Sequence, residues 1–210
     1  MNGICYIVGA GEDHGLDFAS GAEDCVIACD GGYAALQAAS IEPDVILGDF
    51  DSLGYVPQGR ELVCLPTEKA DTDTWAAVEC GIQKGYRSFR LYGCTGGRVD
   101  HTLANIQTAA AMAQRGMECL IFDKTQIITA ICNGTIRFDA EHTGYLSVFS
   151  YSDRCEGITL KGLKYELTDA VLTNSHPLGV SNEFLGVSSS VTVENGTLVL
   201  VYDRKSSQTH

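Results

Sequence analysis

The stretch Val45-Ile46-Leu47-Gly48-Asp49-Phe50-Asp51-Ser52 joins a short apolar run to two carboxylates that stand two residues apart. A continuous apolar run of this kind is typical of a strand that is buried on both faces of a sheet. Alternate side chains of an extended chain point the same way, so Asp49 and Asp51 can face one point in space. Two carboxylates that close repel each other unless a cation lies between them, and Mg²⁺ accepts such oxygens together with water and phosphate. The stretch predicts a strand that ends in a metal site, and a polar loop that caps the next element is the alternative.

Similar apolar runs occur on both sides of this stretch, and turn or polar residues follow each of them. These runs lie at residues 4–8, 25–29, 62–65, 89–92 and 119–122. Segments with the composition or apolar spacing of helices lie between them, at residues 33–39, 75–82 and 102–115. Thr72 or Asp73 would make a good N-cap for the second helix, and Gly116 fits the C′ position after the third. Apolar strands that alternate with helices predict a parallel sheet with helices on both faces.

The character of the chain changes after about Asp123, where short β-rich segments and turn signals follow one another. Asn133-Gly134 and Asn195-Gly196 each lie between two such segments and predict two hairpins. We expect a small antiparallel sandwich or barrel from about residue 130 to 203. The predicted fold class is therefore α/β, with an N-terminal parallel-sheet Rossmann-like domain at residues 1–125 and an antiparallel β-sandwich domain at residues 126–210.

The composition describes an ordinary soluble globular protein and narrows the kinds of partner. Hydrophobic residues make up 45% of the chain, charged residues 20%, and the net charge is −13 at pH 7. A nucleic-acid partner would need a basic face, so the acidic balance argues against one and suits a cationic small molecule. No apolar run is long enough to span a bilayer, and no basic segment precedes the first apolar run, which argues against a membrane protein and against a signal peptide.

The nine cysteines indicate the cellular compartment. They are odd in number, none forms a Cys-x-x-Cys pair, and the closest two are Cys25 and Cys29. Several lie inside apolar runs, where a free thiol behaves as a small hydrophobic side chain. This usage favours reduced cysteines in a cytoplasmic protein over disulfides or a zinc site.

Four polar loops follow the ends of predicted strands and should gather at one edge of the sheet, where open parallel sheets bind ligands. The loops are Asp30-Gly31-Gly32, Asp49-Phe50-Asp51, Asp71-Thr72-Asp73 and Thr95-Gly96-Gly97-Arg98-Val99-Asp100. So many carboxylates would repel one another unless a divalent metal and a polyphosphate lay between them. The Gly-Gly pairs would let backbone N–H groups approach phosphate, and the planar fork of Arg98 suits phosphate. The pattern predicts a metal–nucleotide site, although the Gly-x-Gly-x-x-Gly and Walker signatures are absent from the sequence.

Each part of this prediction has a plainer structural alternative. Gly31-Gly32 could be a tight turn, and Asp71 and Asp73 could serve only as helix caps. His101 opens a helix and could cap it or pack against it.

In its motifs the sequence resembles the thiamine pyrophosphokinase (thiamin diphosphokinase) family. The matching stretches are Cys29-Asp30-Gly31-Gly32, Pro43 to Ser52, Thr72-Asp73, Gly96-Gly97-Arg98-Val99-Asp100-His101, Leu160 to Tyr165 and Gly179 to Glu183. They occur in order along nearly the whole chain. The resemblance implies transfer of a pyrophosphoryl group from ATP to the hydroxyl of thiamine, which gives thiamine diphosphate and AMP. It also implies Mg²⁺, a catalytic α/β domain, and a β-sandwich domain that binds thiamine in a cleft shared by a homodimer.

The resemblance also implies roles for particular residues. Asp49, Asp51 and Asp73 are expected to bind the metal, and Asp100 either joins them or orients thiamine. The nucleotide contacts are expected to be Asp30, Gly31, Gly32, Thr95, Gly96, Gly97, Arg98 and His101. Thiamine contacts are expected from Asp71, Thr72, Asp100, Ser181 and Asn182. The family often has an acidic residue where this chain has Ala70, so Asp71 is expected to supply the missing carboxylate with a shifted geometry.

Two other functional classes remain open from the residues themselves. A metal-dependent nucleotide-sugar transferase also places Asp-x-Asp at a strand end, but it would not explain the residues around Asp73 and Arg98. A nucleotide or thiamine sensor without catalysis would not need so many candidate metal ligands.

Overall fold

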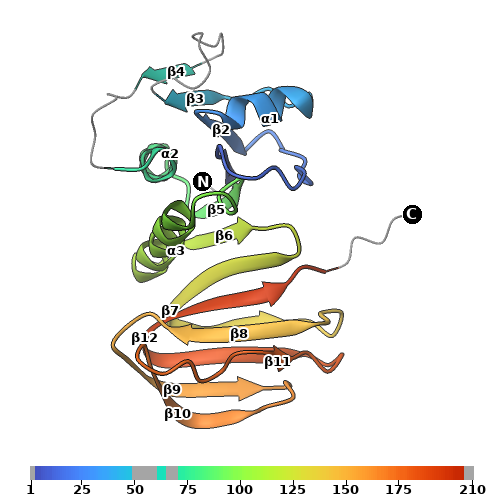
Figure 1. The fold of residues 1–210 in the computed structure, drawn as a ribbon, viewed down its shortest axis with the longest axis vertical. Helices are drawn as coiled ribbons and strands as arrows, with labels where there is room; N and C mark the ends of the chain where they lie inside the picture. Colours follow the sequence, from blue (N-terminus) through green and yellow to red (C-terminus); the bar gives the residue numbers. More distant parts are fainter. Residues whose placement is uncertain (1–2, 49–60, 65–70, 206–210) are drawn as a thin grey trace. The chain divides into compact units, whose positions relative to one another are not determined.

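The structure is a computed structural model that describes residues 3–48, 61–64 and 71–205. The chain forms two compact units. The first comprises Met1–Thr108 and Glu118–Lys124, and the second comprises Ala109–Met117 and Thr125–His210. In the described part of the chain, six strands and three helices precede the antiparallel strands of the second unit (Figure 1).

The first unit is built on a parallel sheet. Its strands are β1 (Ile4–Val8), β2 (Cys25–Cys29), β3 (Val45–Gly48), β4 (Glu61–Cys64), β5 (Ser88–Tyr92) and β6 (Glu118–Phe122). They pair in the order β4-β3-β2-β1-β5-β6, and every one of these pairings is parallel. The predicted parallel sheet is therefore confirmed for the described strands.

The two faces of this sheet bury different side chains and carry different helices. On one face Tyr6, Val8 and Ala28 pack with Leu36 of α1 (Gly32–Ala38) in a single apolar cluster. Strand side chains alternate between faces, so Cys5 lies on the opposite face, beneath α2 (Asp73–Gln83). Figure 1 accordingly shows α1 on one side of the strands and α2 on the other, with the start of α3 (Val99–Gln114) on the α2 side.

The helix ends follow the local sequence signals. Thr72 is the N-cap of α2, and its hydroxyl accepts a hydrogen bond from the backbone N–H of Trp75 at 3.2 Å. Gly116 has φ of 68° just after α3, and its N–H donates to the carbonyl of Ala113 at 3.0 Å. Both predicted caps are confirmed. In the described part of the chain, no helix combines the length and apolarity needed to cross a bilayer.

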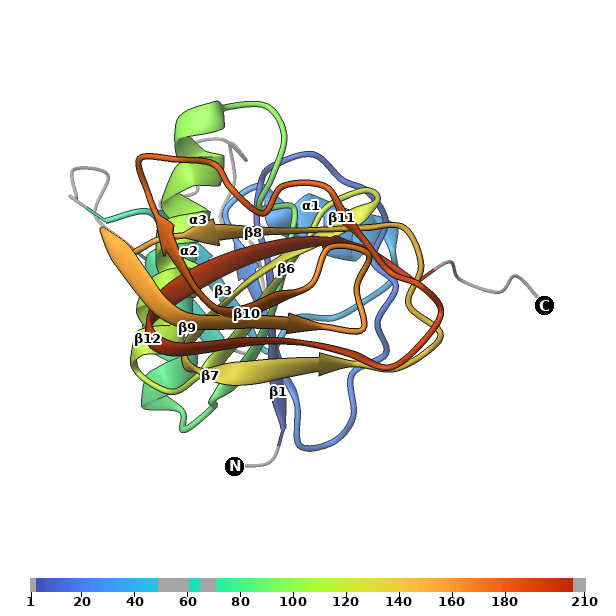
Figure 2. The same cartoon turned by 90° about the horizontal axis from the view of Figure 1, so that it is seen from below.

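The second unit consists of antiparallel strands with their own core. They are β7 (Gln126–Phe138), β8 (Tyr145–Ser150), β9 (Arg154–Lys161), β10 (Leu167–Thr173), β11 (Asn182–Glu183) and β12 (Ser189–Asp203). The long strand β12 pairs with β7, β8 and β9, and Figure 2 shows it running beside β7. Phe138, Leu146, Ile158 and Leu200 lie in the apolar cluster that this unit encloses. The predicted antiparallel character is confirmed, whereas β10 was missed because its side chains are mostly polar or exposed.

The two predicted Asn-Gly hairpins are wrong, because each Asn-Gly pair lies inside a continuous strand. Val193 pairs with Gly134 and Thr197 with Cys132, so three residues of β12 face one residue of β7. Within this bulge Asn133 has φ of 47°, and its side-chain oxygen accepts a hydrogen bond from the N–H of Gly196 at 2.8 Å. Asn and Gly readily adopt a left-handed backbone conformation. Here that conformation forms a bulge between two paired strands that are far apart in the sequence, and not a turn between consecutive strands.

Candidate functional site

The loops after β1 and β5 meet at the carboxyl edge of the parallel sheet. Successive strands run from β1 toward β4 on one side, while β5 and β6 lie on the other, so the strand order changes direction between β1 and β5. Ligands of open parallel sheets bind at such a point. The N–H of Gly11 donates to the carbonyl of Gly93 at 2.7 Å. A Cβ on Gly11 would lie 2.6 Å from that oxygen, so only glycine allows the two loops to come this close.

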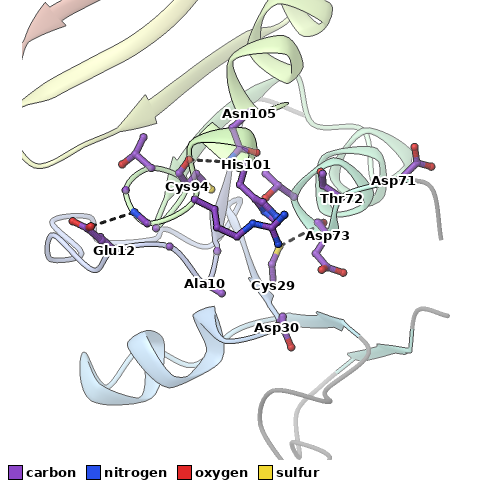
Figure 3. A pocket seen from close by; sticks show the side chains of 18 residues that line it. Ala10, Glu12, Cys29, Asp30, Asp71, Thr72, Asp73, Cys94, His101 and Asn105 are labelled. Atoms are coloured by element: carbon purple, nitrogen blue, oxygen red, sulfur yellow. Dashed lines mark hydrogen bonds between the residues drawn. The ribbon is translucent and has the colours of Figure 1, made fainter. Parts of the chain in front are cut away.

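A cavity of about 890 Å³ opens at this edge of the first unit (Figure 3). Its walls come from the loops after β1, β2 and β5, the loop and first turn of α2, and the first turns of α3. The lining residues are Gly9, Ala10, Gly11, Glu12, Cys29, Asp30, Asp71, Thr72, Asp73, Thr74, Gly93, Cys94, Thr95, Gly96, Gly97, Arg98, His101 and Asn105. Loops that are far apart in the sequence therefore enclose one polar pocket.

The structure brings most of the predicted site residues of the first unit into this pocket. Those that line it are Asp30, Asp71, Thr72, Asp73, Thr95, Gly96, Gly97, Arg98 and His101. Gly31 lines an adjoining cleft, and Gly32 is the first residue of α1, where it is buried. Asp49, Asp51 and Ala70 lie outside the described residues, so the prediction that Asp49 and Asp51 bind a metal stays a prediction.

Asp30 marks the side of the pocket where β3 ends. Its N–H donates to the carbonyl of Leu47 at 2.8 Å, and its backbone is left-handed with φ of 47°. A Cβ on Gly48 would lie 3.2 Å from the Cα of Asp30, so the end of β3 lies directly against this residue. Asp49 and Asp51, the predicted metal ligands, follow Gly48 directly in the sequence.

Arg98 and Asp100 form an exposed pair at the start of α3. The Nε and Nη2 atoms of Arg98 donate to the two carboxylate oxygens of Asp100 at 3.1 and 2.5 Å. The hydrogen bond from Arg98 is the main reason that the pKa of Asp100 lies below its ordinary value, and the same pairing raises the pKa of Arg98. In this geometry Asp100 orients the guanidinium of Arg98, which lines the pocket, while Asp100 itself is not among the lining residues.

Asp73 is the first residue of α2 and Asp71 precedes its N-cap, and Figure 3 shows both beside this helix. Asp71 is exposed, and Asp73 lies in the first helical turn, where a carboxylate also interacts favourably with the helix dipole. The N-cap of α2 is Thr72 and neither carboxylate, and both Asp71 and Asp73 line the pocket.

Sequence reasoning missed Glu12, which contacts the Gly-Gly turn. The N–H of Gly97 donates to Oε1 of Glu12 at 3.2 Å. His14 lies 3.8 Å from Glu12 and 3.5 Å from Asp123, and the hydroxyl of Thr95 donates to Asp123 at 2.6 Å. The carboxylate of Glu12 therefore accepts a hydrogen bond from the N–H of Gly97, which the sequence analysis expects to donate to phosphate. No local motif marks Glu12, because Gly97 and Thr95, whose backbone groups it contacts, come from the distant loop after β5.

Ser181 and Asn182 belong to the second unit and have different surroundings. Ser181 is exposed, and its N–H donates to the hydroxyl of Ser147 at 3.0 Å. Asn182 is only 3% exposed. Its side chain accepts hydrogen bonds from the N–H groups of Tyr165 and Glu183, each at 2.9 Å, and donates to the carbonyl of Tyr165 at 2.7 Å. These contacts tie β11 to the chain segment after β9.

The donor types around the pocket match the preferences of Mg²⁺. Asp30, Asp71 and Asp73 offer carboxylate oxygens, which this hard cation prefers, and it commonly binds through one or two carboxylates together with phosphate oxygens. Among the described residues, no three His, Cys, Asp or Glu side chains are close enough together to hold a metal ion by themselves.

Fold and site together define an α/β protein with a polar, carboxylate-rich pocket at the switch point of a parallel sheet. Two family models match the chain: the catalytic domain of thiamin pyrophosphokinase over residues 19–121, and its vitamin B1 binding domain over residues 133–200. The chain belongs to the thiamin pyrophosphokinase family. Family membership supports the synthesis of thiamine diphosphate by pyrophosphate transfer as its activity.

Individual relatives agree with this assignment. The chain is 29% identical to the thiamine pyrophosphokinase of Bacillus subtilis (strain 168) over 182 residues, which cover 83% of this chain and 85% of that protein. A crystal structure of thiamine pyrophosphokinase from Bacillus subtilis aligns with a TM-score of 0.85 and 25% identity, covering 98% of this chain and 100% of the other. That of thiamin pyrophosphokinase from Geobacillus thermodenitrificans aligns with a TM-score of 0.82 and 30% identity, covering 97% and 99%.

Proposed function

We propose that this chain transfers a pyrophosphoryl group from ATP to the hydroxyl of thiamine in a Mg²⁺-dependent reaction. The products are thiamine diphosphate and AMP. The observation that carries the proposal is a single pocket at the carboxyl edge of the sheet that is lined both by Asp71 and Asp73 and by the Gly96-Gly97-Arg98 turn. Carboxylates for a metal and N–H donors for phosphate are the two sets of groups that phosphoryl transfer requires.

The phosphate chain would be bound by the loop after β5. The N–H groups of Gly96 and Gly97 and the guanidinium of Arg98 would donate to its oxygens, with Asp100 holding the guanidinium in orientation. The N–H of Gly97 would exchange its bond to Glu12 for one to phosphate. Thr95 and His101 would lie along the same wall, and Asp30 with its neighbouring glycines Gly31 and Gly32 would contact another part of the nucleotide.

The metal would be held by Asp73 together with Asp49 and Asp51, of which the last two lie outside the described residues. Charge that develops on the β- and γ-phosphate oxygens would be neutralised by the bound Mg²⁺. The hydroxyl oxygen of thiamine forms a bond to the β-phosphorus, the bond from that phosphorus to the oxygen of AMP breaks, and the hydroxyl proton is released. Asp71 and Thr72 at the α2 edge would contact thiamine, whose positive charge suits a carboxylate-rich pocket.

The finer architecture and assembly belong to the same proposal. We propose a Rossmann-like catalytic domain at residues 1–125 and a β-sandwich domain at residues 126–210 that binds thiamine and dimerises, in a cytoplasmic homodimer with a shared thiamine site. Support comes from the exposed apolar side chains of Leu178, Val180 and Leu185, which are 48%, 46% and 56% exposed and flank Ser181 along the chain. Exposed apolar side chains that form one contiguous patch are typical of interaction surfaces, and we propose that these three do so.

The test measures AMP and thiamine diphosphate after incubation with ATP, Mg²⁺ and thiamine. Both products should appear in equal amounts, and Asp51→Asn and Asp73→Asn should each lower the rate by about a hundredfold or more, as loss of a metal ligand does. Asp169→Asn is the matched control, because Asp169 is exposed, lies in the second unit and has a left-handed backbone that Asn tolerates. A rate near wild type in Asp51→Asn would show that the metal assignment is wrong, and binding without turnover would favour a sensor.

A further inference from the structure

One face of α3 and the residue before it line the large pocket with three polar side chains. Arg98, His101 and Asn105 are separated by three and four positions, so they lie on the same side of the helix. Arg98 and His101 are exposed, whereas Asn105 is only 4% exposed. Asn105 therefore places a buried amide on the wall of the pocket.

The amide of Asn105 has one end bound to the protein and one end open. Its Nδ2 donates to the carbonyl of Cys94 at 2.7 Å, a bond that Figure 3 marks with a dashed line. Only the NH₂ group of an amide can donate to a carbonyl, so this bond fixes which end of the side chain faces Cys94. No described residue donates a hydrogen bond to the other end, Oδ1. Buried polar atoms normally have a partner, so a ligand of this pocket can supply the missing donor.

The open acceptor selects a particular kind of ligand group. Phosphate oxygens accept hydrogen bonds and do not bind an amide oxygen, whereas a hydroxyl group can donate to one. The carbonyl that Asn105 binds belongs to the residue directly before the Thr95-Gly96-Gly97 turn. Oδ1 therefore lies at the base of the loop that we propose binds the phosphate chain, and a hydroxyl bound there lies beside the transferred group.

We propose that Oδ1 of Asn105 accepts a hydrogen bond from the hydroxyl group of thiamine and orients this group for attack. The inference rests on the proposed function, since it takes the loop after β5 to hold the phosphate chain. A hydroxyl whose hydrogen points to Asn105 can direct an oxygen lone pair toward the β-phosphorus. The amide oxygen is not basic enough to take the proton, which passes to water as the bond from oxygen to phosphorus forms. A neutral acceptor also avoids the repulsion that a carboxylate would exert on the phosphate oxygens.

The test compares thiamine with the analogue in which hydrogen replaces the hydroxyl group. Titration calorimetry uses the full chain with Mg²⁺ and α,β-methylene-ATP, which carries the phosphate chain but cannot release AMP. Wild type should bind thiamine about three- to tenfold more tightly than the analogue, as one hydrogen bond provides. Asn105→Leu has a side chain of similar shape without the amide and should bind both compounds equally. Asn105→Asp retains an oxygen acceptor and should restore the preference for thiamine.

Thr108→Val is the matched control, because Thr108 is a buried polar residue of the same helix that does not line the pocket. It is also 4% exposed, and its hydroxyl donates to the carbonyl of Ala104 at 3.0 Å. This variant should prefer thiamine by the same factor as wild type. Asn105→Ala gives the same comparison as the leucine variant should that variant fail to fold.

The ratio of the two affinities separates a contact with the hydroxyl from a structural role. A role of Asn105 only through the carbonyl of Cys94 would weaken thiamine and the analogue by the same factor, and that result would overturn the inference. Equal binding of the two compounds by wild type would overturn it too, and so would a loss confined to the nucleotide. If the hydroxyl preference behaves as expected but no thiamine diphosphate forms from ATP, the proposed function fails and the hydroxyl contact stands.

Discussion

Replacing Asn182 with alanine removes a buried amide that joins two segments of the second unit. The side chain makes three hydrogen bonds of 2.7 to 2.9 Å, two to the backbone of Tyr165 and one to the N–H of Glu183. Asn182 is 3% exposed, so water does not replace the amide unless the surrounding chain moves. Alanine therefore leaves backbone donors and an acceptor without their partners.

The expected cost follows from these bonds. A buried backbone group that loses its partner costs about 1–3 kcal/mol. The side chain of Tyr165 is 58% exposed, so its backbone can regain some hydration, and the lower end of that range applies to each group. We expect Asn182→Ala to lower the free energy of unfolding by about 2–3 kcal/mol, which corresponds to a fall in Tm of about 4–12 °C for a chain of this size.

Urea denaturation, combined with titration of thiamine, tests this expectation. Ser181→Ala is the matched control, since Ser181 is exposed and its contact with Ser147 uses the backbone N–H, so its stability should change by less than about 0.5 kcal/mol. An Asn182→Ala protein with unchanged stability and a lost affinity for thiamine would refute the reasoning. It would identify Asn182 as a direct ligand contact, which is the role that the family resemblance implies.

Two further predictions concern charged groups. Glu12→Gln keeps an acceptor for the N–H of Gly97 but removes a negative charge beside the Gly96-Gly97 turn. Tripolyphosphate should therefore bind about two- to fivefold more tightly, as measured by calorimetry. Unchanged or weaker binding would contradict this expectation. The pKa of Asp139 is lowered to about 2, chiefly by the hydrogen bond from Lys205, so this carboxylate stabilises the fold above its ordinary pKa and loses that contribution as the pH falls toward 2. Denaturation of Asp139→Asn across this acid range should show a weaker dependence on pH than wild type, and an identical pH dependence would count against the ion pair.

Features that depend on near neighbours in the sequence were predicted correctly. Thr72 caps α2 and Gly116 follows α3, because capping uses only the residues within one helical turn. The parallel sheet of the first unit was also predictable, since continuous apolar runs between helical segments allow few other arrangements. The same topology explains why Asp30, Asp73 and Arg98 meet at one edge.

Features that depend on distant partners could not be read from the sequence. Glu12 contacts Gly97, which lies 85 residues away, and no motif couples these two positions. Asn182 carries an amide whose partners lie at Tyr165, so its burial follows from the pairing of β11 and not from its neighbours. The Asn-Gly pairs misled for the same reason, because the local preference for a left-handed backbone fits a bulge as well as a turn.

The bulge between β7 and β12 also sets how each half of β12 faces the core. Side chains alternate along a strand, so the number of residues between Val193 and Thr197 determines which of the later side chains point inward. With three residues between Val193 and Thr197, both Leu198 and Leu200 are fully buried. Deleting a single residue such as Asn195 would turn that half of the strand over and expose both leucines. Insertions and deletions should therefore be tolerated far more readily in the surface loops than between Val193 and Thr197 in the middle of β12.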